Sequence, residues 1–281
     1  MIRKTALILS ALAITAVAAV TVLFLVSEDV MQNKNPFIRR FTPHTAQQVG
    51  SIDLKYNSYY FAGHDGDRIY LGNYSAPLRG LSIGRDFKTN AFTIIPQASD
   101  FRFKRLRLRV AGSLFYLMDG SVPCIYSGNT ASWNASLSDT PLPFFDSAVP
   151  TVAGGFIFRA NSSIDGSYIL GNFTSGKSEQ PKLFNGLLKT QDSVDGIFGS
   201  DGELGFSSSL GRFVYVYRYR NQFLVCRPDG LTDYKGKTID TVERPAIKVA
   251  AVRDKREKMM AAPPLTVNAH TAVAGNLLFI D

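Results

Sequence analysis

Residues 208–221 read SSLGRFVYVYRYRN, and this stretch decides the fold. From residue 212 onward Phe, Val, Tyr and Arg alternate, and a period of two is typical of a half-buried antiparallel β-strand. Gly211 stands before this run and Asn221 stands after it. Gly adopts positive φ without a steric penalty, and Asn tolerates the same region, so both residues suit hairpin turns. The stretch therefore predicts two antiparallel strands around Gly211 and a second turn at Asn221.

The same pattern recurs at four other places in the chain. Each copy has an apolar strand, a Gly, a second apolar strand and then Asn or Asp. The other copies are SYYFAGHDGDRIYLGN (58–73), LRVAGSLFYLMDG (108–120), PTVAGGFIFRAN (150–161) and TAVAGNLLFID (271–281). The turn glycines are Gly63, Gly112, Gly154, Gly211 and Gly275. The closing polar residues are Asn73, Asp119, Asn161, Asn221 and Asp281.

Further strands follow the first four copies. A third strand is predicted at PLRGLSIG (77–84), VPCIYSG (122–128), SYILGNF (167–173) and QFLVCRPDG (222–230). A fourth is predicted at AFTIIPQ (91–97) and TIDTVERP (238–245). A recurring unit of four antiparallel strands is the signature of a β-propeller blade. The alternative is an unrelated series of hairpins in a β-sandwich, and the unequal spacing of the five glycines leaves that alternative open.

The stretch IDLKYNSYYFAGHDGDRIYLGNYSAPL (52–78) resembles the opening blade of six-bladed, TolB-like propellers from exported bacterial proteins. The resemblance covers roughly residues 36–281 and includes no catalytic motif. It concerns the fold alone, and a fold does not determine a function. It implies six blades, of which four and the first half of a fifth are visible. We therefore expect a fragment or a truncated product, folded as an open arc with an unpaired strand near each end.

The first part of the chain predicts a membrane anchor. Residues 6–26 contain no charge and are long enough, as a helix, to cross the hydrocarbon core. Arg3 and Lys4 precede them, so residues 1–5 should be cytoplasmic and the bulk of the chain extracytoplasmic, periplasmic or at the cell surface. Residues 27–35 would be a linker to the propeller domain at 36–281. A cleaved signal peptide is the alternative, although its apolar region is usually shorter.

The chain is basic, with 31 Lys and Arg against 23 Asp and Glu and a formal net charge of +8. A positive net charge can indicate that the protein binds nucleic acid, anionic lipid or an acidic ligand. An exported domain meets little nucleic acid, so that partner is not expected. A protein partner or an anionic ligand remains.

The stretch DFRFKRLRLRVAG (100–112) is the one candidate binding site. Basic and apolar residues alternate along it, and the adjoining Lys104 and Arg105 predict a bulge. In a blade this segment would be the innermost strand, next to the channel. Its basic face could collect carboxylates, phosphates or sulfated sugars, and the predicted anion site consists of Arg102, Arg107 and Arg109. The alternative is a solvated or ion-paired face.

No catalytic residue, cofactor or metal site is predicted. The three His residues share no zinc-binding spacing, and the acidic stretch at 192–206 does not match a calcium loop and is interpreted as a turn-rich connection. Cys124 and Cys226 fall in different blades, so no disulfide is predicted between them. The function that fits best is a binding or scaffolding module. The alternative is a hydrolase or lactonase acting in the channel, and a sensory ectodomain is a third possibility.

Overall fold

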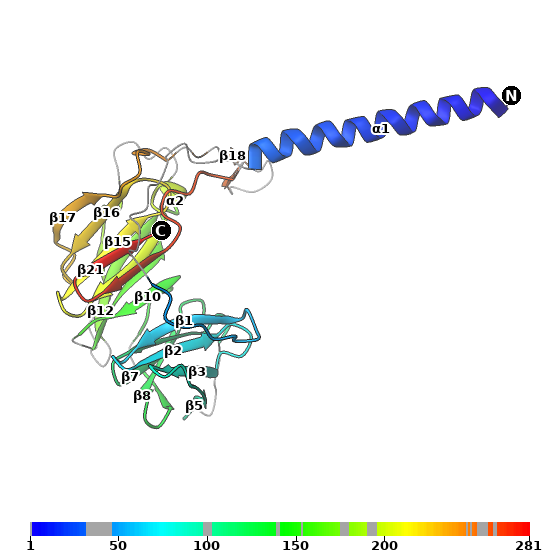
Figure 1. The fold of residues 1–281 in the computed structure, drawn as a ribbon. Helices are drawn as coiled ribbons and strands as arrows, with labels where there is room; N and C mark the ends of the chain where they lie inside the picture. Colours follow the sequence, from blue (N-terminus) through cyan, green and yellow to red (C-terminus); the bar gives the residue numbers. More distant parts are fainter. Residues whose placement is uncertain are drawn as a thin grey trace.

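The computed structural model describes residues 2–31, 47–97, 103–138, 141–152, 154–174, 180–189, 196–245, 247, 249–251, 258–260 and 263–281. It contains one long helix, α1 (Ile2–Met31), and its other regular elements are almost all β-strands (Figure 1). The strands form four four-stranded units, here called blades 1 to 4, and a two-stranded half-blade at the carboxyl end. The β-propeller class predicted from the repeat, preceded by an apolar helix, is confirmed.

Blades 1 and 2 are joined into one sheet. Blade 1 consists of β1 (Tyr59–His64), β2 (Arg68–Asn73), β3 (Arg79–Gly84) and β4 (Thr89–Thr93). Blade 2 consists of β6 (Arg107–Ala111), β7 (Leu114–Asp119), β8 (Cys124–Asn129) and β9 (Asn134–Leu137). Neighbours within each blade are antiparallel, whereas β1 and β6 pair in parallel at Gly63 with Val110 and His64 with Ala111. The short β5 (Ile95–Pro96) pairs with β9 and completes a nine-stranded sheet.

Blades 3 and 4 are separate four-stranded antiparallel sheets. Blade 3 consists of β10 (Ser147–Pro150), β11 (Gly155–Asn161), β12 (Tyr168–Thr174) and β13 (Lys182–Phe184). Blade 4 consists of β14 (Gly202–Ser207), β15 (Arg212–Tyr217), β16 (Gln222–Cys226) and β17 (Thr232–Lys237), preceded by the short helix α2 (Gly196–Gly199). The half-blade consists of β20 (Thr271–Ala274) and β21 (Leu277–Ile280). The units follow one another along an arc, and α1 projects away from it (Figure 1).

The apolar core lies between consecutive blades. Successive side chains of a strand point to opposite faces, so each strand serves two interfaces. Phe115 and Leu117 of β7 pack against blade 1, whereas Tyr116 and Met118 of the same strand pack against blade 3. Burying an apolar side chain of this size contributes about 1.5–3 kcal/mol. The alternation in the sequence is therefore the physical reason that the sheets stack.

The turn glycines behave as the repeat predicts, with one exception. Gly112, Gly154, Gly211 and Gly275 have φ between 58° and 69°, and a Cβ at each would meet open space. Gly63 instead lies within β1, at a register shift, and a Cβ there would lie 2.0 Å from the carbonyl oxygen of Val110. The prediction that Gly63 makes the first turn is therefore wrong. Gly63 is required because the backbone of β6 approaches β1 at this point.

Two short strands, β18 (Val249–Ala251) and β19 (Lys258–Met260), pair antiparallel after residue 247, while residues 252–257 lie outside the described part. Two other local predictions are wrong. Residues 238–245 form no strand, because the fourth strand of blade 4 is β17, immediately before them. Lys104 and Arg105 form a bend rather than a bulge, because their N–H groups both bind the carboxylate of Asp119, at 2.6 and 2.5 Å.

Candidate anion site on the inner strands

The first strands of the successive units form the inner wall of the arc. Within the described residues β1 contacts β6, β6 contacts β10, β10 contacts β14, and β14 contacts β20. We call these five strands the inner wall, and its polar side chains are the candidate functional residues.

The structure places two of the three predicted anion-site residues on the inner wall. Arg107 and Arg109 belong to β6, where they alternate with the buried Leu108 and Val110. Arg107 is exposed and Arg109 is half-buried. Their position on an innermost strand is as predicted. Arg102 lies outside the described residues.

Two tyrosines of blade 1 accompany these arginines. The guanidinium of Arg107 lies 4.2 Å from the ring centre of Tyr74 and 5.6 Å from that of Tyr60, and the two ring centres are 4.5 Å apart. The backbone N–H of Leu108 donates to the hydroxyl of Tyr60 at 2.7 Å, which fixes this ring against β6. A cation over an aromatic face is stabilised by about 0.5–1 kcal/mol at an exposed site, so the rings orient Arg107 without neutralising its charge.

Burial of its guanidinium lowers the pKa of Arg109, although Tyr60, Tyr74 and Glu203 oppose this shift. Within the described part of the chain, no carboxylate lies at ion-pair distance from Arg107 or Arg109. Glu203, the acid that acts on Arg109, is held elsewhere: it pairs with Arg218 at 3.3 Å and accepts from the N–H and hydroxyl of Thr271 at 2.8 and 2.9 Å. Within the described residues Arg107 and Arg109 thus form no ion pair.

Arg159 and Arg218 of blades 3 and 4 differ, because each forms ion pairs. Arg159 of β11 pairs with Asp146 at 2.5 Å and with Asp201 at 2.9 Å, and its guanidinium lies 4.1 Å from the ring centre of Tyr168. Arg218 pairs with Asp201 at 3.4 Å and with Glu203. These contacts form a continuous chain of alternating charges from blade 3 to the half-blade. Ion pairs within the chain neutralise the charges of Arg159 and Arg218, which distinguishes them from Arg107 and Arg109 on β6.

Sequence reasoning missed several of these residues. The acidic stretch at 192–206 was interpreted as a turn-rich connection, but Glu203 is part of β14 and Asp201 stands immediately before it. Asp192 and Asp195 lie outside the described residues. Tyr60 and Tyr74 carried no signal of their own, because they reach the site from another blade. The alternation of basic and apolar residues along β6 was the one feature of the sequence that indicated the site.

Neither the cysteines nor the acids form a second chemical centre in the described residues. Cys124 lies in β8 and Cys226 in β16, two blades apart, both are buried, and no disulfide joins them. Burial raises the pKa of Cys124 to about 11. Among the described residues no group of three or more His, Cys, Asp or Glu side chains could hold a metal ion.

No protein-family model and no curated protein matches this chain. Among solved structures, it is similar to a chain of a nidogen/laminin complex, with 13% identity and a TM-score of 0.43, over 67% of each chain. It is also similar to YCF48 bound to D1 peptide, with 15% identity and a TM-score of 0.39, over 76% of this chain and 64% of that one. AztD of Citrobacter koseri matches with 10% identity and a TM-score of 0.35, over 79% and 65%. Similarity this remote carries no conclusion about ligand or activity.

Proposed function

We propose that this chain is a membrane-anchored, extracytoplasmic β-propeller that acts as a binding module and recognises an anionic group on its inner wall. Residues 1–5 are the cytoplasmic end, residues 6–26 the membrane anchor, residues 27–35 a linker and residues 36–281 the propeller. The ring is of the six-bladed kind that the TolB-like resemblance implies. The partner is a protein or a smaller ligand that carries carboxylate, phosphate or sulfate.

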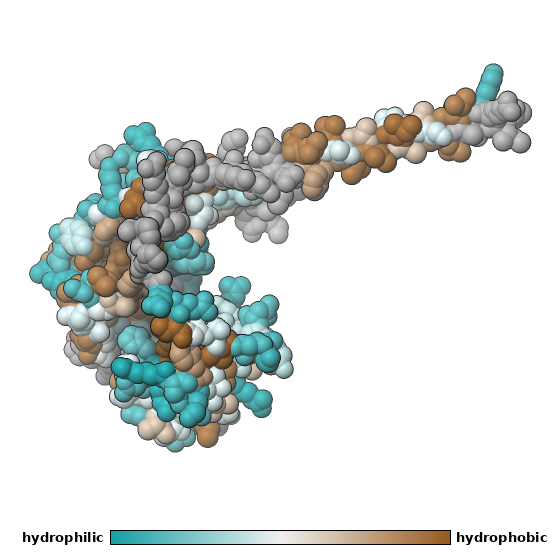
Figure 2. Space-filling model, in the orientation of Figure 1, coloured by the Kyte–Doolittle hydropathy of each residue, from teal (hydrophilic) through white to brown (hydrophobic). Residues whose placement is uncertain are grey.

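Two features of α1 support the anchor. Its apolar segment Leu7–Val26 is not covered by any other part of the described chain, and Figure 2 shows apolar residues along the visible face of the helix. A helix that is apolar on all sides requires an apolar environment, which a membrane supplies. Arg3 and Lys4 at its start favour the orientation in which the propeller lies outside the cytoplasm.

The observation that carries the binding function is the pair of guanidinium groups of Arg107 and Arg109, two residues apart on one face of β6, which form no ion pair with the described residues. A partly buried cation is costly unless a counter-charge accompanies it. An anion would supply that charge and would receive charge-assisted hydrogen bonds from donors that the rings of Tyr60 and Tyr74 already orient. The arginines that are already paired, Arg159 and Arg218, could not do this without losing their own partners.

The test uses heparin, a sulfated polyanion, and the full chain in detergent. We expect binding that weakens steeply with added salt, because exposed charges are screened over ~8 Å at physiological ionic strength. The double change Arg107→Gln and Arg109→Gln should lower the affinity about tenfold or more at low salt. The matched control is Arg68→Gln with Arg79→Gln, which removes the same charge from exposed positions of β2 and β3.

Equal losses in the double variant and in its control would overturn the site, because binding would then follow net charge alone. The double variant should also have the same melting temperature as the parent chain. Arg107→Gln alone, at an exposed position, guards against a folding defect and should reproduce part of the loss.

A further inference from the structure

The four blades all point in the same direction. The first strands of blades 1 and 2, β1 and β6, run parallel. The turn after β7 lies beside the start of β10, because the N–H of Phe145 donates to the carbonyl oxygen of Gly120 at 3.2 Å. The starts of β10 and β14 are also neighbours, since Arg159, opposite Ser147 of β10, binds the carbonyl oxygen of Gly202. The turns from first to second strand and from third to fourth strand therefore lie at one end of all four blades, which we call the tip end.

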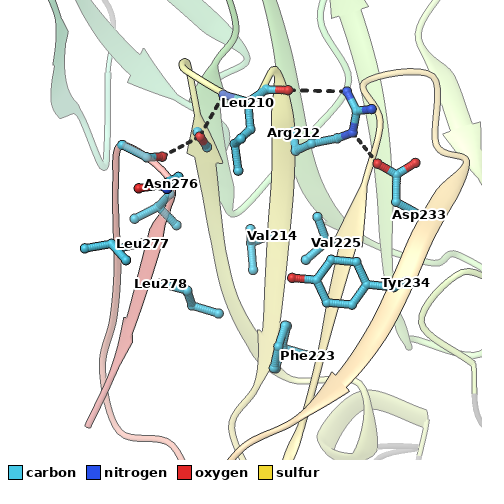
Figure 3. Close-up of a pocket in the computed structure, with 13 residues that line it drawn as sticks. Leu210, Arg212, Val214, Phe223, Val225, Asp233, Tyr234, Asn276, Leu277 and Leu278 are labelled. Atoms are coloured by element: carbon cyan, nitrogen blue, oxygen red, sulfur yellow. Dashed lines mark hydrogen bonds and ion pairs between the residues drawn. The ribbon is translucent and has the colours of Figure 1, made fainter.

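Every blade exposes a large apolar side chain at the tip end. These side chains are Phe87 in the β3–β4 turn, Leu114 at the start of β7, Val152 in the β10–β11 turn and Leu231 in the β16–β17 turn. Their exposed fractions are 43%, 45%, 67% and 57%. Figure 3 shows a fifth, Leu210, at the tip end of blade 4, whereas Phe223 of the same blade lies toward the other end. Such a series, recurring at the same end of every blade, marks a surface that contacts an apolar partner.

Charged side chains at the tip end pair with one another. The ion pairs are Asp67–Arg85, Asp86–Lys88, Arg212–Asp233 and Arg227–Asp229. Each pair is locally neutral, so the attraction of this end for a charged partner is weak. The opposite end also exposes apolar residues, Phe144 and Ile164 among them, but it includes Arg107, which forms no ion pair within the described residues. The two ends therefore differ in charge rather than in apolar content alone.

Phe87 holds a backbone conformation that its side chain disfavours. Its φ is 60°, and a bulky residue is rare at positive φ because its Cβ crowds the backbone. Gly would occupy this turn position without strain. A strained residue that the turn itself does not need indicates that the side chain has a role. The ring is partly exposed and lies against Gly50, where a Cβ would come within 2.6 Å of it.

Gly50 connects the tip end with the membrane anchor. Residue 47 is the first described residue after α1, and residues 32–46 lie outside the described part. Gly50 therefore belongs to the segment that leads from the helix to β1. Through its contact with Phe87, this segment passes the tip end before it reaches the start of β1. The end of the propeller that the described chain meets first after α1 is thus the end with paired charges and exposed apolar turns.

We propose that the tip end of the propeller rests on the surface of the bilayer that α1 spans, with its apolar side chains in the interfacial layer. This docking rests on the membrane anchor of the proposed function and is independent of the anion site on β6. Transfer of apolar side chains out of water favours the contact, and the tether to α1 raises the effective concentration of the surface, so a weak affinity is sufficient. The start of β6, with Arg107, then faces away from the membrane, where a ligand can reach it.

Fluorescent labels at the two ends of the blades test this orientation. Val152→Cys and Leu231→Cys place a thiol at the tip end, and Ile164→Cys places one in the β11–β12 turn at the opposite end. Each full chain carries a nitrobenzoxadiazole label and is reconstituted in phosphatidylcholine vesicles that contain a spin-labelled lipid. We expect this lipid to quench the labels at positions 152 and 231 and to leave the label at position 164 bright. The unsubstituted chain, whose two thiols are buried, measures background labelling.

Two changes at the tip end should weaken the contact in the Val152→Cys chain. Phe87→Gly removes an exposed ring and also relieves the positive φ, so it should reduce quenching without lowering the melting temperature. Leu231→Asp places a charge in the contact and should reduce quenching as well. The matched control is Ile164→Asp, at a side chain of the opposite end that is 94% exposed, and it should leave quenching unchanged.

Vesicle composition and flotation separate the outcomes. Quenching should be the same when anionic phosphatidylglycerol is added, because the charges at the tip end are paired, and a requirement for anionic lipid would overturn the apolar contact. Chains that fail to float with the vesicles in a density gradient would refute the anchor, and the docking with it. Chains that float while the labels at positions 152 and 164 are quenched alike, or position 164 more strongly, would overturn the docking alone.

Discussion

Arg159 of blade 3 joins Asp201 of blade 4 through an ion pair of 2.9 Å, and the two side chains are only 14% and 21% exposed. The same guanidinium binds Asp146 of its own blade and the carbonyl oxygen of Gly202 in the next. One side chain therefore ties two sheets that share no backbone hydrogen bond within the described residues.

Arg159→Leu should destabilise the fold by about 2–3 kcal/mol, because it leaves the partly buried Asp146 without its counter-charge and Asp201 with Arg218 alone, at 3.4 Å. Arg159→Lys should recover only part of this loss, since an ammonium cannot reproduce the planar fork. Arg85→Gln is the control: Arg85 and Asp67 form a pair that is 80% and 84% exposed, and its loss should cost under about 1 kcal/mol. Urea unfolding of the three variants measures the difference. Similar midpoints for Arg159→Leu and Arg85→Gln would contradict the bridging role.

Gly63→Ala should cost about 3 kcal/mol or more, because its Cβ would meet the carbonyl oxygen of Val110 at 2.0 Å. Gly112→Ala is the matched change. Gly112 has φ of 60° but open space around it, so only the left-handed backbone is penalised, by about 1 kcal/mol. Thermal melting compares the two, and an equal loss of stability would refute the close approach of β1 and β6.

Acid should destabilise the chain in part through Asp119. Burial alone would raise its pKa, but hydrogen bonds from Arg105, Lys104 and Ser121 outweigh it and hold the pKa below its ordinary value. The folded state therefore binds this proton less readily than the unfolded state. The resulting stability is present above the unfolded pKa of about 3.9 and is lost as pH falls through the folded value.

Asp119→Asn should thus lower stability at pH 7 and flatten the decline of stability on the acid side. Urea midpoints measured from about pH 6 to pH 3 report this slope. Asp67→Asn, at a side chain that is 84% exposed, should leave the profile close to that of the parent chain. An unchanged slope in Asp119→Asn would show that this carboxylate is not a source of the acid sensitivity.

Both cysteines should react with iodoacetamide after denaturation without any reductant, because no disulfide joins Cys124 and Cys226. In the folded chain at about pH 8 the reaction should be slow, since burial raises the pKa of both thiols and the thiolate is the reactive form. Peptide mapping measures the two sites separately. Recovery of both residues in one linked peptide would be incompatible with their places in blades 2 and 4.

The orientation of the anchor can be tested in cells. Protease added to spheroplasts should digest the propeller, because the basic residues before the apolar helix favour the cytoplasmic side. The chain should also stay with the membrane after alkaline carbonate extraction. Complete protection from the protease would reverse the orientation, and a mature amino terminus beyond Val26 would replace the anchor with a cleaved signal.

Much of the blade pattern could be predicted because its causes are local. Gly at a positive-φ turn and a period of two in the side chains located β7, β8, β15 and β16 closely. The strand β17 was missed because its residues are almost all exposed, so no apolar alternation marks it. Gly63 was misplaced because its role depends on Val110, a residue of another blade.

The candidate site was predictable only in part, for the same reason. Arg107 and Arg109 stand out within one short stretch of sequence. Tyr60 touches β6 across 48 residues, and Glu203 acts on Arg109 from blade 4. Nothing in the local pattern of either residue reports such a partner. Arg159 and Arg218 have ion-pair partners within the described residues, whereas Arg107 and Arg109 do not. This difference arises only when the blades assemble.

The parallel pairing of β1 with β6 gives the arc two kinds of joint. Blades 1 and 2 share a hydrogen-bonded ladder, whereas the hydrogen bonds that join blade 3 to blade 4 within the described residues each involve at least one side chain. Amide hydrogens of the first two blades should therefore exchange with solvent as one cooperative block, and those of blades 3 and 4 as separate blocks. A pulling force applied along the arc would open it first at the side-chain joints and leave the nine-stranded sheet until last.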